Sequence, residues 1–302
     1  REKYECLTME FTQTRRSLLK KIALGASAII AAPAIPFASG NELKNKLKLK
    51  GNINHSVCRW TYSFLPLDEL CREVKKIGFS AIDLAGPKDW PTLKANNIFS
   101  SMCNGAEISL TKGWADKQYH ATLIKNYTEH IEMVSAAGYK NLICFSGSRD
   151  GMDDETGLNN CVEGLKKILA FAEKKGVTIQ MELLNSKVDH KDYLCDRSAW
   201  GVELCKRLNS ESFKLLYDIY HMQIDEGDVI RTIKDNHQYF GHYHTGGVPG
   251  RHEINETQEI FYPAVMKAII ATGFKDYVAQ EFIPAAENKI ASLKQAIKIC
   301  DV

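Results

Sequence analysis

The feature that most constrains the fold is a regular alternation of short apolar runs with longer amphipathic segments, from about residue 52 onwards. The apolar runs have the length and composition of strands buried on both faces of a parallel sheet. Between them, segments such as 66–78 carry apolar side chains at helical spacing. The predicted strands are 52–60, 80–85, 98–105, 141–147, 177–184, 213–220, 239–246 and 277–283.

Eight strand-then-helix units within about 250 residues is the arrangement of a (β/α)8 barrel. The structural rival is a doubly wound open sheet, which usually carries a glycine-rich GxGxxG turn after its first strand. No such turn follows the run 52–60. The sequence therefore predicts an α/β fold with a single (β/α)8 TIM barrel domain over residues 41–302.

Residues 1–40 read as a leader and not as part of the barrel. The twin arginines Arg15 and Arg16 precede Ser-Leu-Leu-Lys, an apolar run over 22–38 and small residues, which resembles a twin-arginine (Tat) export signal. We expect cleavage near residues 38–40, a periplasmic location and the Tat translocase as partner during export. Retention would instead leave a membrane anchor, but a 17-residue run interrupted by one glycine and two prolines is short for a span of about 20 residues.

Charge and cysteine content limit the classes of partner. Residues 1–39 hold six of the 39 basic and three of the 37 acidic residues, which leaves the remainder with a net charge of about −1. This balance gives no basic surplus for a nucleic-acid partner. The eight cysteines after residue 40 are scattered and form no CxxC pair, so buried thiols are preferred to the disulfides that an exported protein could carry.

Charged or imidazole side chains stand near the ends of four consecutive predicted strands. These residues are Glu182, Asp218, His244 and Glu281. Each alone has a plainer reading, as a solvated loop residue or a helix N-cap. Barrel enzymes, however, build their sites at the carboxyl ends of strands, and three carboxylates brought together there repel unless a cation lies between them. The pattern predicts a divalent metal centre, with Mn²⁺ or Mg²⁺ preferred and Co²⁺ or Zn²⁺ as alternatives.

The segments YDIYHMQ, MELLN, GHYHTG, VPGRHEIN and QEF together resemble the hydroxypyruvate isomerase family of xylose isomerase-like barrels, which also includes ketose 3-epimerases. The resemblance implies that Glu182, Asp218, His244 and Glu281 are the metal ligands. It also implies that His221 contacts the substrate. His242, two residues before His244, reads either as a second residue supporting the site or as a packed side chain, and it is counted among the candidate substrate-binding residues.

The resemblance implies proton transfer next to a carbonyl. The two glutamates would face the substrate carbon from opposite sides, through an enediolate that the metal and His221 stabilise. Two departures concern the substrate. Val188 stands where relatives carry an acidic residue, with Asp189 one position further on, and Arg251 lies near but not at the position of an arginine that relatives carry. Arg251 is kept as a candidate substrate-binding residue.

The leading hypothesis is a metal-dependent, hydroxypyruvate isomerase-like aldose–ketose isomerase acting on a small carbohydrate or hydroxy-carbonyl compound. The alternatives are a ketose 3-epimerase or keto-sugar lyase of the same barrel type, or a non-catalytic sugar-binding protein with a degenerate site. A barrel endonuclease is disfavoured, because a trinuclear zinc site needs more histidine ligands than these strands supply. The sequence contains no readable signal for oligomeric state.

Overall fold

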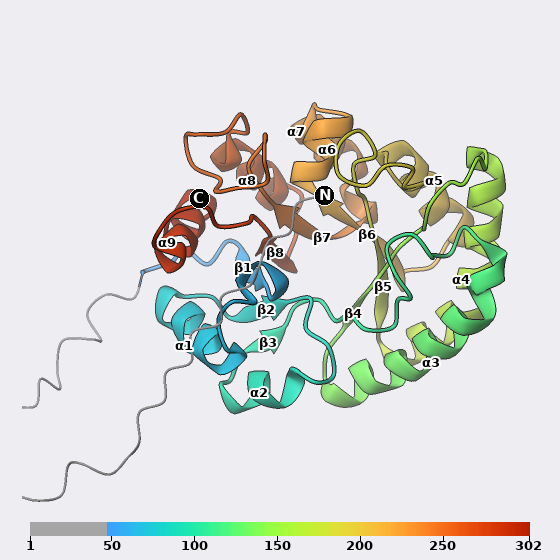
Figure 1. The fold of residues 1–302 in the computed structure, drawn as a ribbon, viewed down its shortest axis with the longest axis horizontal. Helices are drawn as coiled ribbons and strands as arrows, with labels where there is room; N and C mark the ends of the chain where they lie inside the picture. Colours follow the sequence, from blue (N-terminus) through green and yellow to red (C-terminus); the bar gives the residue numbers. More distant parts are fainter. Residues whose placement is uncertain (1–46) are drawn as a thin grey trace, which may run out of the picture. The chain divides into compact units, whose positions relative to one another are not determined.

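The structure is a computed structural model and describes residues 47–302 (Figure 1). The predicted leader, residues 1–40, and the first residues of the predicted barrel domain lie outside the described residues. Within residues 47–302, none of the helices has both the length and the apolar character that a membrane crossing requires.

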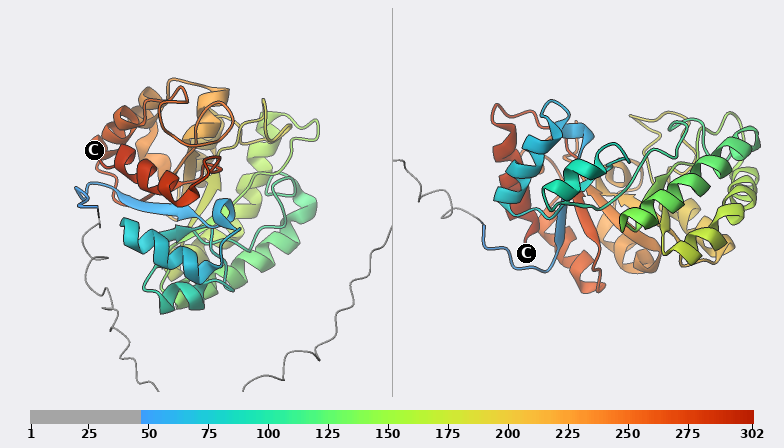
Figure 2. Two further views of the ribbon diagram at one scale, coloured as in Figure 1. Left: turned by 60° about the vertical axis from the view of Figure 1, so that its left-hand side comes forward. Right: turned by 90° about the horizontal axis from the view of Figure 1, so that it is seen from below.

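Eight parallel strands form one sheet in the order β3-β2-β1-β8-β7-β6-β5-β4. Their bounds are β1 (Asn54–Cys58), β2 (Ala81–Asp83), β3 (Phe99–Ser100), β4 (Asn141–Cys144), β5 (Thr178–Glu182), β6 (Phe213–Asp218), β7 (Phe240–Thr245) and β8 (Tyr277–Gln280). The sheet curls with the helices around its outside (Figures 1 and 2). The predicted (β/α)8 TIM barrel is confirmed.

The edge strands β3 and β4 meet through one residue that belongs to neither. Cys103 forms single parallel bridges with Ala85 and Leu142. Its amide donates to the carbonyl of Asn141, and its own carbonyl accepts from the amide of Ile143. At this edge the backbone pairing of the described residues therefore runs through Cys103, with one further hydrogen bond from Asn141 Nδ2 to the Ser101 carbonyl, whereas paired strands form the rest of the barrel.

The helices follow the strands in the expected alternation. Their bounds are α1 (Leu67–Ile77), α2 (Trp90–Ala95), α3 (His120–Ala137), α4 (Asp154–Lys175), α5 (Ser198–Leu208), α6 (Ile219–Asp225), α7 (Val229–Asn236), α8 (Tyr262–Ala271) and α9 (Lys289–Cys300). The ends of α4 show how the sequence sets these limits. The Asp153 carboxylate caps the first turn by accepting from the amide of Thr156, and Gly176 ends the helix in the left-handed conformation.

The predicted strand 213–220 is wrong at its carboxyl end. Strand β6 stops at Asp218, and helix α6 begins at the next residue. The cause is local, because the Asp218 carboxylate accepts hydrogen bonds from the backbone amides of Tyr220 (2.8 Å) and His221 (3.2 Å) and so caps the first turn. His221 therefore lies on a helix and not at the end of a strand.

The loops that follow β3 and β4 cross at two glycines. The amides of Trp114 and Ala115 donate to the carbonyls of Phe145 (3.2 Å) and Ser146 (2.8 Å). A Cβ atom on Gly113 would overlap the backbone of the β4 loop, and one on Gly147 would come within 2.6 Å of the Gly113 nitrogen. Only glycine allows the two backbones to approach this closely.

The preference for buried thiols is confirmed for the part of the chain that the structure describes. All eight cysteines there are free and buried. They are Cys58, Cys71, Cys103, Cys144, Cys161, Cys195, Cys205 and Cys300.

A buried histidine on β1 predicts acid sensitivity. His55 is 3% exposed, and neither ring nitrogen has a hydrogen-bond partner among residues 47–302. Burial lowers the pKa of His55 from 6.5 to about 4, against the opposing charge of Asp301. As pH falls from 6.5 towards 4, His55 therefore becomes protonated in the unfolded chain but stays neutral in the folded chain. The free energy of unfolding falls by about 3 kcal/mol over this range.

Urea unfolding of wild type and of His55→Phe from pH 4 to pH 8 measures this contribution. The variant's packing change shifts stability equally at every pH, so only the dependence on pH is compared. We expect the wild type to lose stability relative to the variant between pH 6.5 and pH 4. Parallel pH profiles for the two proteins would contradict the assignment to His55.

Candidate metal centre

The four predicted ligands come from neighbouring strands at the carboxyl end of the barrel. Glu182 and Asp218 end β5 and β6, His244 lies one residue before the end of β7, and Glu281 directly follows β8. One ligand atom from each lies within 4.8 Å of all the others, and all four side chains are buried. The structure thus brings the predicted set together, and its role in binding a metal stays a prediction.

His244 lies at the centre of this cluster. Its Nδ1 is 3.1 Å from Glu182 Oε1 and 2.8 Å from Glu281 Oε2, and its Nε2 is 2.9 Å from Asp83 Oδ1. Although burial favours the neutral ring, the adjacent Glu281 raises the pKa of His244 well above its usual value. The imidazole is therefore held between carboxylates on both edges.

Arg251 supplies a second positive charge. Its Nη2 lies 2.6 Å from Glu281 Oε2 and 3.5 Å from Asp218 Oδ2. The guanidinium is stacked between two rings, with its Cζ 5.2 Å from the centre of Trp60 and 5.3 Å from that of Tyr220. The prediction that Arg251 belongs to the site is consistent with this placement, although its partners here are carboxylates of the protein.

The balance of charges fits a divalent ion. Four carboxylates meet two cationic groups, which leaves two negative charges uncompensated in a buried space; the carboxylates are Asp83, Glu182, Asp218 and Glu281. Protonation is one response, since burial and the charge of Glu281 raise the pKa of both Glu182 and Asp218. A divalent cation would also offset these carboxylates, with His244 as a neutral ligand and an oxygen-rich set that suits Mn²⁺ or Mg²⁺.

One carboxylate oxygen is free to take such an ion. Asp218 Oδ1 is used to cap α6, whereas Asp218 Oδ2 is buried with no hydrogen-bond partner in the described part of the chain. An orphaned buried carboxylate oxygen is costly unless a ligand or ion uses it. The residues present therefore fit a divalent metal.

His221 faces the same space with a hydrogen-bond donor. Asn185 Oδ1 accepts from the amides of Val188 (3.0 Å) and Asp189 (2.9 Å), which fixes Nδ2 as the side that meets His221 Nδ1 at 2.6 Å. His221 Nδ1 must then accept, so the proton of the neutral ring is on Nε2. Burial and the charge of Arg251 lower the pKa of His221 well below its usual value, so the ring is neutral.

The direction of this donor matters for chemistry. His221 Nε2 is buried, 3.6 Å from Asp218 Oδ2, and without a hydrogen-bond partner within residues 47–302. An N–H group held in this way can donate to a substrate oxygen on which negative charge develops.

Asp83 is a member of the site that the sequence analysis missed. It ends β2, and its Oδ2 lies 2.8 Å from His242 Nε2 while its Oδ1 meets His244. His242, predicted to bind substrate or to support the site, contacts Asp83 and is fully buried. The signal was available, because Asp83 is a charge within the apolar run SAIDLA.

The loop after β5 places Val188 and Asp189 differently. Val188 is 61% exposed. The carboxylate of Asp189 instead accepts from Tyr220 Oη (2.8 Å) and lies 3.9 Å from His221 Nδ1.

Trp60 is a second residue of the site that the sequence analysis missed. Its Nε1 donates a hydrogen bond to Glu281 Oε1 at 2.8 Å.

Several known proteins whose sequences match this chain are named isomerases or epimerases. 2-Oxo-tetronate isomerase of Cupriavidus necator is 34% identical over 122 residues, which cover 39% of this chain and 46% of that protein. D-Psicose 3-epimerase of Ruminiclostridium cellulolyticum is 26% identical over 206 residues, which cover 60% of this chain and 68% of the epimerase. The chain thus matches about half the length of the first relative.

Solved structures support the same fold. An AP endonuclease, family 2, from Brucella melitensis superposes with a TM-score of 0.71 at 22% identity, covering 78% of this chain and 95% of that one. D-Psicose 3-epimerase of Clostridium cellulolyticum H10 with D-tagatose gives 0.66 at 18% identity, covering 83% and 100%. Residues 71–300 match the family described as xylose isomerase-like TIM barrel. Together with the eight-stranded barrel, this match shows that the chain belongs to the xylose isomerase-like TIM barrel family.

Proposed function

We propose that this protein is a metal-dependent isomerase of small hydroxy-carbonyl compounds, of the hydroxypyruvate isomerase type. The observation that carries the proposal is the buried cluster of Glu182, Asp218, His244 and Glu281, with the unpartnered Nε2 of His221 beside it. The named relatives supply the reaction class, because 2-oxo-tetronate isomerase and D-psicose 3-epimerase are among them.

The chain's own residues supply the proton transfers. A divalent ion, when bound, polarises a substrate carbonyl and thereby acidifies the neighbouring C–H bond. One of the two glutamates, Glu182 or Glu281, takes the proton from that carbon, which leaves an enediolate. His221 donates its Nε2–H to the developing oxyanion. Returning a proton to the former carbonyl carbon, while the adjacent hydroxyl loses its own, completes the move of the carbonyl by one carbon.

Arg251 contributes to binding in this proposal. Its guanidinium pairs with Glu281 and is held between two aromatic rings, so it can exchange that partner for an anionic or hydroxyl group of the substrate. A 2-oxo acid offers both a carboxylate for Arg251 and a carbonyl for proton transfer.

Epimerisation at the carbon next to the carbonyl is the second candidate. The epimerase relative covers more of this chain than 2-oxo-tetronate isomerase of Cupriavidus necator does, and psicose 3-epimerase structures superpose on more than four fifths of it. Two glutamates on opposite sides of a substrate carbon suit this reaction as well, because the proton would leave on one face and return on the other.

One experiment tests both candidates. Purified protein is analysed for bound metal, then incubated in D₂O with Mn²⁺ and with hydroxypyruvate and a panel of ketoses, and followed by proton NMR. Isomerisation moves the carbonyl, epimerisation leaves it in place with deuterium at the neighbouring carbon, and a lyase breaks or desaturates the chain. Stoichiometric metal with no exchange on any compound would favour a non-catalytic sugar-binding protein.

Asp218→Asn provides the matched test of the centre. The amide keeps a cap for α6 but removes the charge that faces the other ligands, so we expect the variant to lose stoichiometric metal and deuterium exchange. Asp235→Asn, an exposed position on α7, serves as the control. If Asp218→Asn held as much metal as wild type, the proposal that these four residues bind the ion would be wrong.

We also propose export through the twin-arginine pathway, on the motif at Arg15 and Arg16. Cells that express the protein are fractionated, and the periplasmic share is measured for wild type and for the double variant Arg15→Lys, Arg16→Lys. We expect the variant to stay in the cytoplasm. Equal periplasmic shares would rule the motif out.

A further inference from the structure

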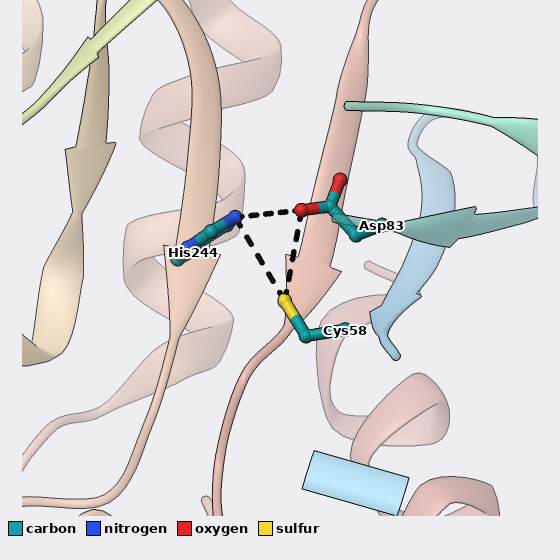
Figure 3. A group of neighbouring side chains, drawn as sticks. All are labelled: Cys58, Asp83 and His244. Carbon is teal, nitrogen blue, oxygen red and sulfur yellow. Dashed lines mark hydrogen bonds and ion pairs between the residues drawn. The ribbon is translucent and has the colours of Figure 1, made fainter. Parts of the chain in front are cut away.

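Asp83 lies at the edge of the candidate centre, and its side chain is fully buried beside Cys58 and His244 (Figure 3). Its Oδ1 is 2.9 Å from His244 Nε2. Its Oδ2 accepts from Ser101 Oγ at 2.6 Å and is 2.8 Å from His242 Nε2. The Ser101 hydroxyl and the His244 ring thus meet different oxygens of Asp83, which is the arrangement of a carboxylate that accepts at both oxygens.

This carboxylate determines which edge of the His244 ring faces the ligand cluster. Asp83 can only accept, so His244 Nε2 must carry a proton and donate it. The opposite edge then presents Nδ1 to Glu182 and Glu281. A histidine that binds a metal through one nitrogen commonly donates the N–H of the other to a carboxylate, which fixes the ring and makes it a better ligand.

Cys58 completes a triangle with these two residues, which raises the question of a second cation site (Figure 3). Its Sγ lies 3.6 Å from Asp83 Oδ1 and 3.9 Å from His244 Nε2. The 2.9 Å separation of Nε2 and Oδ1 is that of a direct hydrogen bond, and the Cys58 thiol can donate to the same Oδ1.

We propose that Asp83 is a positioning residue, which holds His244 with Nδ1 directed at the ion in the four-ligand centre. The role rests on the proposed metal dependence and acts only through His244. Ser101 touches the same carboxylate without touching the four-ligand cluster, so it provides a comparison within one set of contacts.

The test measures the Mn²⁺ dissociation constant by calorimetry in folded protein. We expect Asp83→Ala and Asp83→Asn to weaken binding by about 10–100-fold, the range for groups that orient a metal-binding histidine. Asn keeps the shape of Asp, so it guards against a failure of the Ala variant to fold. Ser101→Ala removes another hydrogen bond of the same carboxylate and is expected to leave the Mn²⁺ affinity unchanged.

A double-mutant cycle separates positioning from general support of the fold. If Asp83 acts through His244, then Asp83→Ala has no further effect on Mn²⁺ affinity in a His244→Ala background. Additive effects, or wild-type affinity in both Asp83 variants, would overturn the positioning role and leave the metal centre standing. Wild type without stoichiometric Mn²⁺ would overturn the centre, the proposed function and this role together.

The absorption spectrum of the Co²⁺-substituted protein tests whether Cys58, Asp83 and His244 bind an ion themselves. Co²⁺-substituted wild type is expected to show no thiolate-to-cobalt charge-transfer absorption, because Cys58 stays a thiol and Nε2 stays a donor. An absorption of that kind, lost in Cys58→Ser and kept in Cys103→Ser, would show an ion bound by Cys58, Asp83 and His244. That result would overturn the positioning role, because Nε2 would then be a ligand.

Discussion

Glu182→Gln and Glu281→Gln are each expected to slow deuterium exchange into the substrate by about 10²–10⁴-fold, the usual contribution of a general acid or base. Gln keeps the shape of the side chain and can still occupy the cluster, but it can neither take nor hold the transferred proton. The rate is measured by proton NMR in D₂O at saturating Mn²⁺. Exchange is compared per molecule of bound metal, so a loss of ligand is separated from a loss of proton transfer.

Glu253→Gln is the matched control for a buried glutamate outside the centre. Its Oε1 accepts from the amides of Ala285 and Ala286 and from Ser292 Oγ, so the carboxylate supports the loop before α9. We expect this variant to lose stability and keep its exchange rate. Full activity in Glu182→Gln or in Glu281→Gln would remove that residue from the proton transfer.

Gly113→Ala is expected to cost more than about 3 kcal/mol of unfolding free energy, because overpacking against fixed backbone exceeds the usual 1–3 kcal/mol of an overfilled core. The added methyl group would overlap the backbone that runs through Phe145 and Gly147, and no flexible side chain can move aside. Equilibrium unfolding in urea gives the difference.

Gly176→Ala calibrates that measurement. Gly176 ends α4 with φ +65°, and a Cβ there meets no atom within 4 Å, so only the left-handed backbone is penalised. We expect a loss of about 1–2 kcal/mol. Similar losses in the two variants would mean that the β3 and β4 loops can separate, against the close approach in the structure.

The number and order of the strands could be predicted because each is buried on both faces and therefore reads as an apolar run. Strand β6 is an example, with Asp218 as the one charge in Phe213–Asp218. Asp83 is likewise a charge within an apolar run, so the same reasoning would have identified it as a candidate site residue. Asp83 lies inside the predicted strand 80–85 and is the last residue of the three-residue strand β2.

Other features depend on contacts that composition does not reveal. The apolar residues after Asp218 continued the strand pattern, and only the hydrogen bonds of its carboxylate turn the chain into α6. Arg251 reaches the cluster because Gly250 and Arg251 both adopt positive φ, which redirects the loop after β7. A backbone reversal of this kind has no fixed signature in a single sequence.

The single-residue bridge at Cys103 makes the β3–β4 edge the place where we expect the barrel to open locally. In the part of the chain that the structure describes, β3 and β4 have no ladder of their own and are joined through Cys103 and the hydrogen bond from Asn141 Nδ2 to the Ser101 carbonyl, whereas all four candidate ligands come from the continuous β5 to β8 half of the sheet. Local opening follows the places with fewest bonds, so the amides of Cys103 and Ile143 should exchange with solvent before those of β6 and β7. Slow motion of the barrel would then spare the geometry of the metal centre, and widening at the β3–β4 edge would leave proton transfer undisturbed.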